Sequence, residues 1–331
     1  MRPETVSALV VTWNSLGYIE ECLTSLRGQG PIIKEIVVVD NGSADGTVEW
    51  LRRQADVTLI EEDVNLGFAA ANNRGLARCS GGAVLLVNAD VKLAPDYTDR
   101  CLGHMSREDI GSVTGKLLRA EPAGVIDSTG HNVYGLGWAE NRGEMAPDGP
   151  SFDRGQEVFG VCAAAGLYRA SALASVSIDG EIFDESYFSY IEDVDLDWRL
   201  RWAGWRAWYE PEAVAIHHRS ATGARFSAPM MRHILKNRLL TVVKNYDRRW
   251  LLRQGFGVAA FTTVKTADFG RRHPLAAMGL VDFARLLPAA MRKRRAVKSL
   301  RRASSAEMRG WLLPFPWRER VLRRLRRPER A

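Results

Sequence analysis

The chain has 331 residues, of which 46% are hydrophobic, and a formal net charge of +7. This length and hydrophobic content suffice for a packed core and for two domains. The positive charge is concentrated, because residues 292–330 contain fifteen Lys and Arg against three Glu, a balance of +12, and the rest of the chain carries −5. A globally basic surface is therefore excluded, and the basic tail needs a local explanation.

Cysteine usage and apolar runs indicate the compartment. The four Cys residues are scattered, with no C-x-x-C pair and no zinc-like spacing, which favours a reduced, intracellular protein. No uncharged apolar run approaches the roughly 18–20 residues that a membrane span needs. The best candidate, 255–264, ends at Lys265. The first residues lead directly into an apolar run, so we expect no signal peptide and a cytoplasmic protein.

Apolar runs typical of buried strands alternate with helical patterns along the first half of the chain. The strand candidates are residues 6–12, 32–39, 57–60 and 83–87. This alternation predicts an α/β fold built of βαβ units around a mostly parallel sheet. Ligands of such sheets bind at the carboxyl ends of the strands. Polar groups follow three of these ends, at residues 12–14, 40–43 and 88–90.

The third of these polar ends has two interpretations, and the second has one. Asn88-Ala89-Asp90 is either a turn or a hard-cation site, in which Asp90 bridges through Mg²⁺ or Mn²⁺ to a diphosphate. Asp40, before a turn and a helix, can accept hydrogen bonds from a base or a ribose. No G-x-G-x-x-G or G-x-x-x-x-G-K-[ST] occurs, which argues against a dinucleotide oxidoreductase and a P-loop NTPase. The remaining interpretation is a nucleotide held by a carboxylate and a metal, without a glycine-rich loop.

From about residue 110 to 160 the pattern is irregular and rich in Gly and Pro, with short strands expected around residues 113–118 and 132–137. Beyond it, an aromatic run turns into an acidic helix, whose stripe at Leu196, Leu200 and Ala203 ends at Gly204. The dipole favours acids in a first helical turn, which explains one or two of them. A carboxylate at the mouth of an aromatic cleft can also act as a general base. The helix carries four carboxylates, Glu192, Asp193, Asp195 and Asp197.

Two adjacent histidines, His217 and His218, end a later apolar run. Adjacent residues of a strand point to opposite faces, so at most one of them faces a given site. A buried or surface pair is the ordinary interpretation. The alternative is that one His completes an octahedral metal site otherwise made of oxygen ligands.

Six segments in order over about residues 6–220 resemble glycosyltransferase family 2, the inverting GT-A transferases, and within it the rhamnosyltransferase-like branch. They are 10–14 (VVTWN), 37–47 (VVVDNGSADGT), 65–75 (NLGFAAANNRG), 85–90 (LLVNAD), 183–193 (FDESYFSYIED) and 213–217 (AVAIH). The resemblance implies a GT-A fold, Rossmann-like with a mostly parallel sheet between helices, and here with a C-terminal helical extension.

The resemblance also implies roles for residues at the nucleotide. Thr12, Trp13 and Asp40 would hold the nucleobase and ribose, and Asn65 and Gly67 would line the nucleotide pocket. Asn14 and Asn88 are further candidates for nucleotide binding.

The same resemblance assigns the metal and the base. Asn88-Ala89-Asp90 would stand for the D-x-D metal motif, with Asn in its first position and Asp90 as the principal carboxylate. His217 would contact the metal or the diphosphate. Asp193 would be the general base, while Glu192 would orient the acceptor or support the helix start. We interpret Asp195 and Asp197 as structural, paired with Arg199 or Arg201 or solvated.

The family further implies three parts of the chain. Residues 1–225 would form the catalytic domain, with a nucleotide-sugar-binding half (1–105) and an acceptor half (106–225). Residues 226–291 would be a helical extension and 292–331 a basic tail. Arginines interleaved with Trp, Phe and Leu are typical of segments at an anionic membrane surface, so we expect the tail to hold the protein there. The alternative is a solvated tail.

The predicted activity is inverting transfer of L-rhamnose from dTDP-β-L-rhamnose, with Mg²⁺ or Mn²⁺, to a lipid-linked or polysaccharide acceptor of the cell envelope. It would take place at the inner face of the cell membrane. The alternatives are another NDP-hexose or galactofuranosyl transferase and an inactive nucleotide-sugar-binding scaffold. Nucleic-acid binding ranks low because the chain has no recognised motif for it. Whether the protein forms a homodimer is open.

Overall fold

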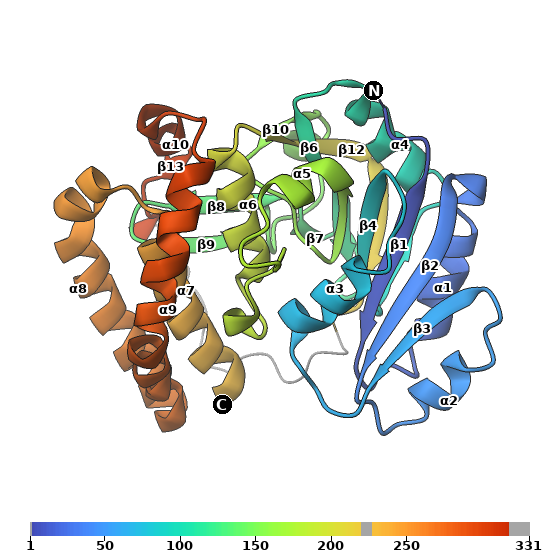
Figure 1. The fold of residues 1–331 in the computed structure, drawn as a ribbon, viewed down its shortest axis with the longest axis horizontal. Helices are drawn as coiled ribbons and strands as arrows, with labels where there is room; N and C mark the ends of the chain where they lie inside the picture. The colour runs from blue at the N-terminus through green and yellow to red at the C-terminus, as the bar shows by residue number, and fades with distance from the viewer. Residues whose placement is uncertain (1, 220–226, 318–331) are drawn as a thin grey trace.

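A mixed sheet forms the centre of the computed structural model, which describes residues 2–219 and 227–317 (Figure 1). Its main strand order is β10-β12-β6-β11-β4-β1-β2-β3, and β5 and β7 pair with β12 and β6. Helices flank this sheet, and further helices from the end of the chain pack together at one side. The predicted α/β class and C-terminal helical extension are confirmed.

The first half of the chain supplies the parallel part of the sheet. Val10 of β1 lies in one buried cluster with Leu23 of α1, and Leu9 lies in another with Ala71 of α3, so helices cover both faces. Burial on both faces explains why these strands are continuous apolar runs. The strands are β1 (Val6–Thr12), β2 (Ile33–Asn41), β3 (Val57–Glu62) and β4 (Ala83–Asn88). The helices are α1 (Ile19–Arg27), α2 (Thr47–Leu51) and α3 (Phe68–Leu76).

The second half extends the same sheet. The strand β11 pairs antiparallel with both β4 and β6, and β12 runs parallel to β6. The predicted irregular stretch thus contains short strands and one long one. These elements are β5 (Val91–Leu93), α4 (Tyr97–Gly103), β6 (Ile110–Arg119), β7 (Ile126–Ser128), β10 (Gln156–Val158), β11 (Ala165–Arg169), α5 (Ala170–Ser175) and β12 (Arg206–His217).

The acidic helix, α6 (Glu192–Trp202), lies between the sheet and the C-terminal helices. Its predicted stripe, which includes Leu196 and Leu200, packs in the cluster under the sheet. On the opposite side, Trp198 and Trp202 pack in a second cluster with residues of the C-terminal helices. A helix buried all round can keep charged side chains only if each is paired, and this sets the geometry of the site.

The C-terminal helices are α7 (Ala228–Asn245), α8 (Arg248–Arg272), α9 (Gly279–Leu300) and α10 (Ser305–Gly310). They end in β13 (Leu312–Leu313), which pairs with β8 (His131–Tyr134) beside β9 (Trp138–Asn141). The boundary predicted at residue 292 falls inside α9. That helix continues because Val297 is fully buried in the cluster that holds Trp202.

One stretch, Pro274–Leu300, has the length and apolar composition of a membrane-crossing helix, whereas the sequence had suggested none. It comprises the 3-10 turn η5 (Pro274–Met278) and α9. Length and composition do not separate such a helix from a core helix, and α9 makes core contacts. Its Lys293 forms ion pairs with Glu181, at 2.6 Å, and with Asp184, at 2.8 Å.

Candidate active site

The polar ends of three neighbouring strands lie together in the sheet. Thr12 of β1 pairs in register with Asp40 of β2, and Val11 pairs with Asn88 of β4. Because these strands are parallel, their carboxyl ends meet at one edge. The structure therefore brings together the residues that the sequence proposed for nucleotide binding.

At this edge, Asp40 closes a turn. Its carboxylate is fully buried and accepts hydrogen bonds from the Ser43 amide, at 2.8 Å, and the Ser43 hydroxyl, at 2.6 Å. Asn14, with φ of 51°, stabilises the same turn through two hydrogen bonds of 2.8 Å. Its backbone amide donates to Ser43 Oγ, and its side-chain Oδ1 accepts from the Ala44 backbone amide. Asp40 and Asn14 thus order the loop on which a nucleotide would rest.

The first strand end leaves two groups available. The buried Oγ1 of Thr12 has no hydrogen-bond partner among the described residues. The Trp13 side chain is 42% exposed, so its ring is open to a stacking ligand.

Asn65 and Gly67 tie the two halves of the domain together. Asn65 Oδ1 accepts hydrogen bonds from Asn41 Nδ2, at 3.0 Å, and from the Gly67 amide, at 2.8 Å. Gly67 has φ of +85°, and a Cβ there would lie 2.6 Å from the Phe188 ring, so only glycine fits. The Ala69 amide donates to the Phe188 carbonyl at 3.0 Å. The segment before α6 is thereby fixed against α3.

A first cluster forms where β5 and β12 pair. His217 Nε2 lies 3.3 Å from Asp90 Oδ1, and His217 Nδ1 lies 2.8 Å from Asp127 Oδ2. All three side chains are buried. Arg219 Nε lies 2.6 Å from Asp127 Oδ1, and Arg119 Nε lies 3.4 Å from the same oxygen. A histidine is thus held between two carboxylates in a partly cationic surrounding.

Protonation in this cluster follows from its charges. Burial alone would lower the pKa of His217, but hydrogen bonds to Asp127 and Asp90 outweigh it and raise that pKa to about 9. Burial likewise opposes ionisation of Asp127, yet His217 and Arg219 lower the pKa of that carboxyl below its usual value. Asp127 therefore carries a fixed negative charge behind the imidazole.

The residues fit a divalent cation. Asp90 Oδ1 and His217 Nε2 converge, and oxygen and imidazole ligands suit Mg²⁺ and Mn²⁺ when combined with phosphate oxygens. Asp127 holds Nδ1, which leaves Nε2 for a metal in the carboxylate–histidine–metal arrangement. Sequence reasoning missed Asp127, which lies on the short strand β7 in the irregular region.

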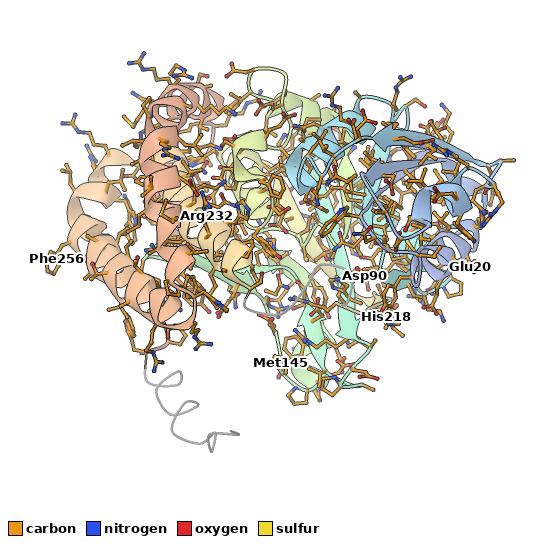
Figure 2. The ribbon with its side chains drawn as sticks, turned by 90° about the horizontal axis from the view of Figure 1, so that it is seen from below. Glu20, Asp90, Met145, His218, Arg232 and Phe256 are labelled. Carbon is orange, nitrogen blue, oxygen red and sulfur yellow. The ribbon has the colours of Figure 1, made fainter. Side chains whose placement is uncertain are left out.

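The neighbouring His218 points elsewhere. Its amide donates to the Asp90 carbonyl at 3.0 Å, which brings the two labelled residues together in Figure 2. Its ring instead contacts Glu21, with Nε2 3.1 Å from Oε2, and lies against Tyr18. The expected split of the two histidines between opposite faces is observed.

A second cluster surrounds the start of α6. His131, the first residue of β8, has Nδ1 at 2.7 Å from Asp197 Oδ2 and Nε2 at 3.5 Å from Asp193 Oδ2. The two aspartates are four residues apart on α6, so one turn of helix presents both to the ring. The Asp193 side chain is 16% exposed, whereas those of Asp197 and His131 are at most 3% exposed. Asp193 is therefore the member that a substrate can reach.

Two acids at this end of α6, Asp197 and Glu192, have raised pKa values. Burial raises the pKa of Asp197 to about 6, although its hydrogen bond to His131 opposes the shift. Burial and the charge of Asp193 raise the pKa of Glu192 well above its ordinary value. The two carboxylates outweigh burial at His131 and raise its pKa well above 6.5. These shifts favour a cationic imidazole beside Asp193 and the protonated form of Glu192.

Cys162 completes this cluster. Among the described residues, its Sγ lies within 4.8 Å of ligand atoms of His131 and Asp193, a spacing at which a metal ion could be held. The imidazole, however, already donates toward both carboxylates. Asp193 Oδ2 also accepts from the Ala163 amide at 3.3 Å, and Asp193 Oδ1 accepts from the Val194 amide at 2.8 Å. We therefore interpret the group as a carboxylate held by hydrogen bonds.

The remaining acids of α6 behave differently from each other. Asp195 is fully buried and binds Arg199, at 3.2 Å as expected, together with Lys244 at 2.8 Å. The expectation for Asp197 was wrong, because it is neither solvated nor paired with an arginine. It binds His131, and a Cβ at Gly160 would lie 1.8 Å from its Oδ2, so glycine is required there.

Residues 7–176 match the family model described as glycosyl transferase family 2. Over 296 residues the chain is 28% identical to the N-acetylglucosaminyl-diphospho-decaprenol L-rhamnosyltransferase of Mycobacterium tuberculosis, covering 80% of this chain and 94% of that protein. It is also 31% identical over 222 residues to the pre-mycofactocin glycosyltransferase of the same organism, covering 65% of this chain and 43% of that protein.

Two solved structures share the fold. The structure of GalNAc-T7 with UDP, GalNAc and Mn²⁺ matches with a TM-score of 0.61 and 13% identity, covering 87% of this chain and 58% of that chain. The mannosyltransferase PcManGT of Pyrobaculum calidifontis, in complex with GDP-Man and Mn²⁺, matches with a TM-score of 0.53 and 18% identity, covering 91% and 86%. Both are glycosyltransferases, and the predicted GT-A fold is confirmed.

Proposed function

This chain belongs to glycosyltransferase family 2, and we propose that it transfers L-rhamnose from dTDP-β-L-rhamnose to a polyprenyl-linked or polysaccharide acceptor. The observation that carries the donor is the match to the mycobacterial rhamnosyltransferase, which extends over 94% of that protein and so includes its C-terminal part. The name of that relative also supports a lipid-linked acceptor for this chain. We further propose that the enzyme acts at the inner face of the cell membrane.

In the proposed reaction, Asp193 accepts the proton of the acceptor hydroxyl while that oxygen attacks the anomeric carbon. His131 donates toward Asp193 and Asp197 and so orients the base. Glu192, whose pKa is raised by burial and by the charge of Asp193, has one carboxyl oxygen without a partner among the described residues and is available to bind the acceptor. A single displacement inverts the anomeric centre and needs no protein nucleophile.

The donor would lie over the strand ends, with Trp13 and Thr12 toward the nucleoside and Asp40 and Asn14 holding the loop beneath it. Asp90 and His217 would hold Mg²⁺ or Mn²⁺, which would supply neutralising charge to the leaving diphosphate. Asp127 keeps the His217 ring in place for this purpose.

The test is a panel of nucleotide sugars offered to the purified protein with a synthetic prenyl-diphosphate-GlcNAc acceptor. We expect dTDP-β-L-rhamnose to be used in preference to UDP-glucose, UDP-galactose, UDP-galactofuranose and GDP-mannose. Inversion would give an α-rhamnoside, which NMR of the product identifies. A β-linked product, or preference for a UDP-hexose, would refute the donor assignment. Absence of nucleotide release with every donor would favour the inactive scaffold.

A further inference from the structure

Large apolar side chains are exposed on the helical extension more than anywhere else in the described residues. Seven of the fourteen exposed large hydrophobic residues come from 252–291. Phe256, 89% exposed, and Leu252, 77% exposed, lie on α8, and Leu275, 69% exposed, follows it. Figure 2 shows Phe256 at the outer edge of the molecule. Single exposed apolar residues are ordinary, whereas a gathered set marks a binding surface.

The outer face of α8 is an ordered stripe. In helical order its exposed residues are basic at both ends and apolar or small between them: Arg249, Leu252, Arg253, Phe256, Ala259, Ala260, Thr263, Val264, Ala267 and Arg271. The inner side of the helix packs on the protein through Val258, Phe261 and Phe269. The exposed stripe is therefore free to contact something outside the chain.

The charge of this stripe identifies its partner. Asp268 is the one acidic residue in the sequence of α8, and it faces inward, with its side chain 13% exposed and Arg272 beside it. A face with arginines at both ends and no acid between them complements an anionic surface. A second copy of this chain, packed about a twofold axis on the same face, would oppose arginine to arginine. Apolar residues flanked by arginines suit the interface of an anionic bilayer.

The sequence predicted that the basic tail contacts the membrane, but the part of the tail that the structure describes packs against the rest of the protein. Arg301 stacks over the Trp202 ring, with its guanidinium 3.8 Å from the ring centroid. Trp311 and Leu312 pack in the cluster around Trp198 and Trp202, and Trp317 packs against Phe261. Several of the side chains that suggested membrane contact therefore pack within the protein instead. Residues 318–331 lie outside the described residues.

We propose that the outer face of α8 is the surface on which this protein rests on an anionic membrane, with Leu252 and Phe256 inserted among the acyl chains and Arg249, Arg253 and Arg271 at the headgroups. The proposal deepens the membrane location given above and makes no use of the donor or the base.

The test is co-sedimentation of the full-length protein with vesicles of phosphatidylcholine alone or mixed with phosphatidylglycerol. We expect binding to the anionic vesicles that weakens as salt rises, because the charge term acts within a Debye length. The double variant Leu252→Ser/Phe256→Ser should bind about tenfold or more weakly, since two inserted side chains are lost. Both positions are exposed, so the fold should survive, which circular dichroism and transfer to a water-soluble acceptor would verify.

Val64→Ser is the matched control, because Val64 is 61% exposed on the loop after β3 and lies outside the helical extension. It should bind as the wild type does. A full-length variant with Arg323, Arg324, Arg326 and Arg327 changed to Ser should keep most of the binding. Wild-type-like binding by the α8 variant, or loss of all binding in the tail variant alone, would overturn the proposal. So would a dimer in solution that dissociates on Phe256→Ser, which would assign the face to a second copy.

Discussion

Two buried histidines in this enzyme are held in the same way, and their surroundings differ. His217 lies between Asp127, at 2.8 Å, and Asp90, at 3.3 Å. His131 lies between Asp197, at 2.7 Å, and Asp193, at 3.5 Å. In each cluster Nδ1 makes the shorter contact, to a fully buried aspartate, and Nε2 points to the aspartate with the proposed chemical role.

The charges around the inner aspartates separate the clusters. Arg219 and His217 lower the pKa of Asp127, which stays ionised, whereas burial raises the pKa of Asp197 to about 6. The first cluster therefore offers fixed charge, suited to a cation and a diphosphate. The second contains Asp197, whose pKa of about 6 lies near neutral pH, and this surrounding suits the movement of a proton. One geometry thus supports two tasks, and the neighbouring charges decide which.

The largest effect is expected from a change at Asp193, the exposed aspartate of the second cluster. Asp193→Asn should lower the transfer rate about 10²–10⁴-fold, because the amide cannot accept the hydroxyl proton. Donor binding, measured by calorimetry, should be nearly unchanged. Asp99→Asn is a suitable control, since that carboxylate is 65% exposed. A rate within about threefold of wild type would remove Asp193 from the base role.

The equivalent change in the first cluster should affect binding as well as rate. Asp90→Ala should weaken both Mn²⁺ and nucleotide binding and lower transfer on the order of a hundredfold, because the leaving diphosphate loses a neutralising charge. Isothermal titration with Mn²⁺ and with the nucleoside diphosphate, each alone and together, measures this directly. Full transfer after exhaustive chelation would mean that arginine and histidine side chains carry this charge instead.

The inner partner of the base gives a smaller effect with a distinctive pH signature. His131→Gln should lower the rate about tenfold. It should also move the acidic limb of the rate profile to higher pH, because a cation that favours the ionised base is gone. A purely structural role would leave the position of that limb unchanged. The rate measured from pH 5 to 9 separates the two, with those limits set on either side of the ordinary histidine pKa of about 6.5.

Stability gives this variant a second measurement. Because folding raises the pKa of His131 above 6.5, its stabilising contribution is complete below that pH and is lost as the pH rises through the folded value. Urea unfolding of the wild type should therefore report a free energy of unfolding that declines in alkaline solution. In His131→Gln that part of the decline should be absent. An identical decline in both proteins would exclude His131 as its source.

The smallest effect is expected at Glu192. Burial and the charge of Asp193 raise its pKa well above 4.5, which favours the protonated carboxyl, and Glu192→Gln keeps the size and the capacity to donate of that form. Transfer should stay within about threefold of wild type. A loss of transfer rate as large as that of Asp193→Asn would mean that Glu192 and Asp193 share the proton transfer, and the proposed difference between their roles would be wrong.

The sequence predicted the proposed ligands of the site but not the residues that support them. Asp90 and His217 follow apolar strands, and strand ends of a parallel sheet are predictable binding positions. Asp127 and His131 come from β7 and β8, in a stretch without periodicity, and only the tertiary fold brings them to their partners. Asp197 was interpreted as solvated or as a partner of Arg199 or Arg201, yet Arg201 Nε donates to the Phe159 carbonyl at 2.8 Å. Local spacing could not reveal that competition.

The burial of α6 on both sides has a consequence for the evolution of this enzyme. Asp195, on the helix that carries Asp193, is held from α7 by Lys244 at 2.8 Å and by Asn245 at 2.8 Å. The C-terminal helices therefore cannot be exchanged between relatives as an independent module. A graft that lacked a cation and an amide at these two positions would leave the buried carboxylate with Arg199 and Tyr187 as its partners, two residues from the base. An extension grafted onto this catalytic domain must therefore supply both residues to keep these contacts.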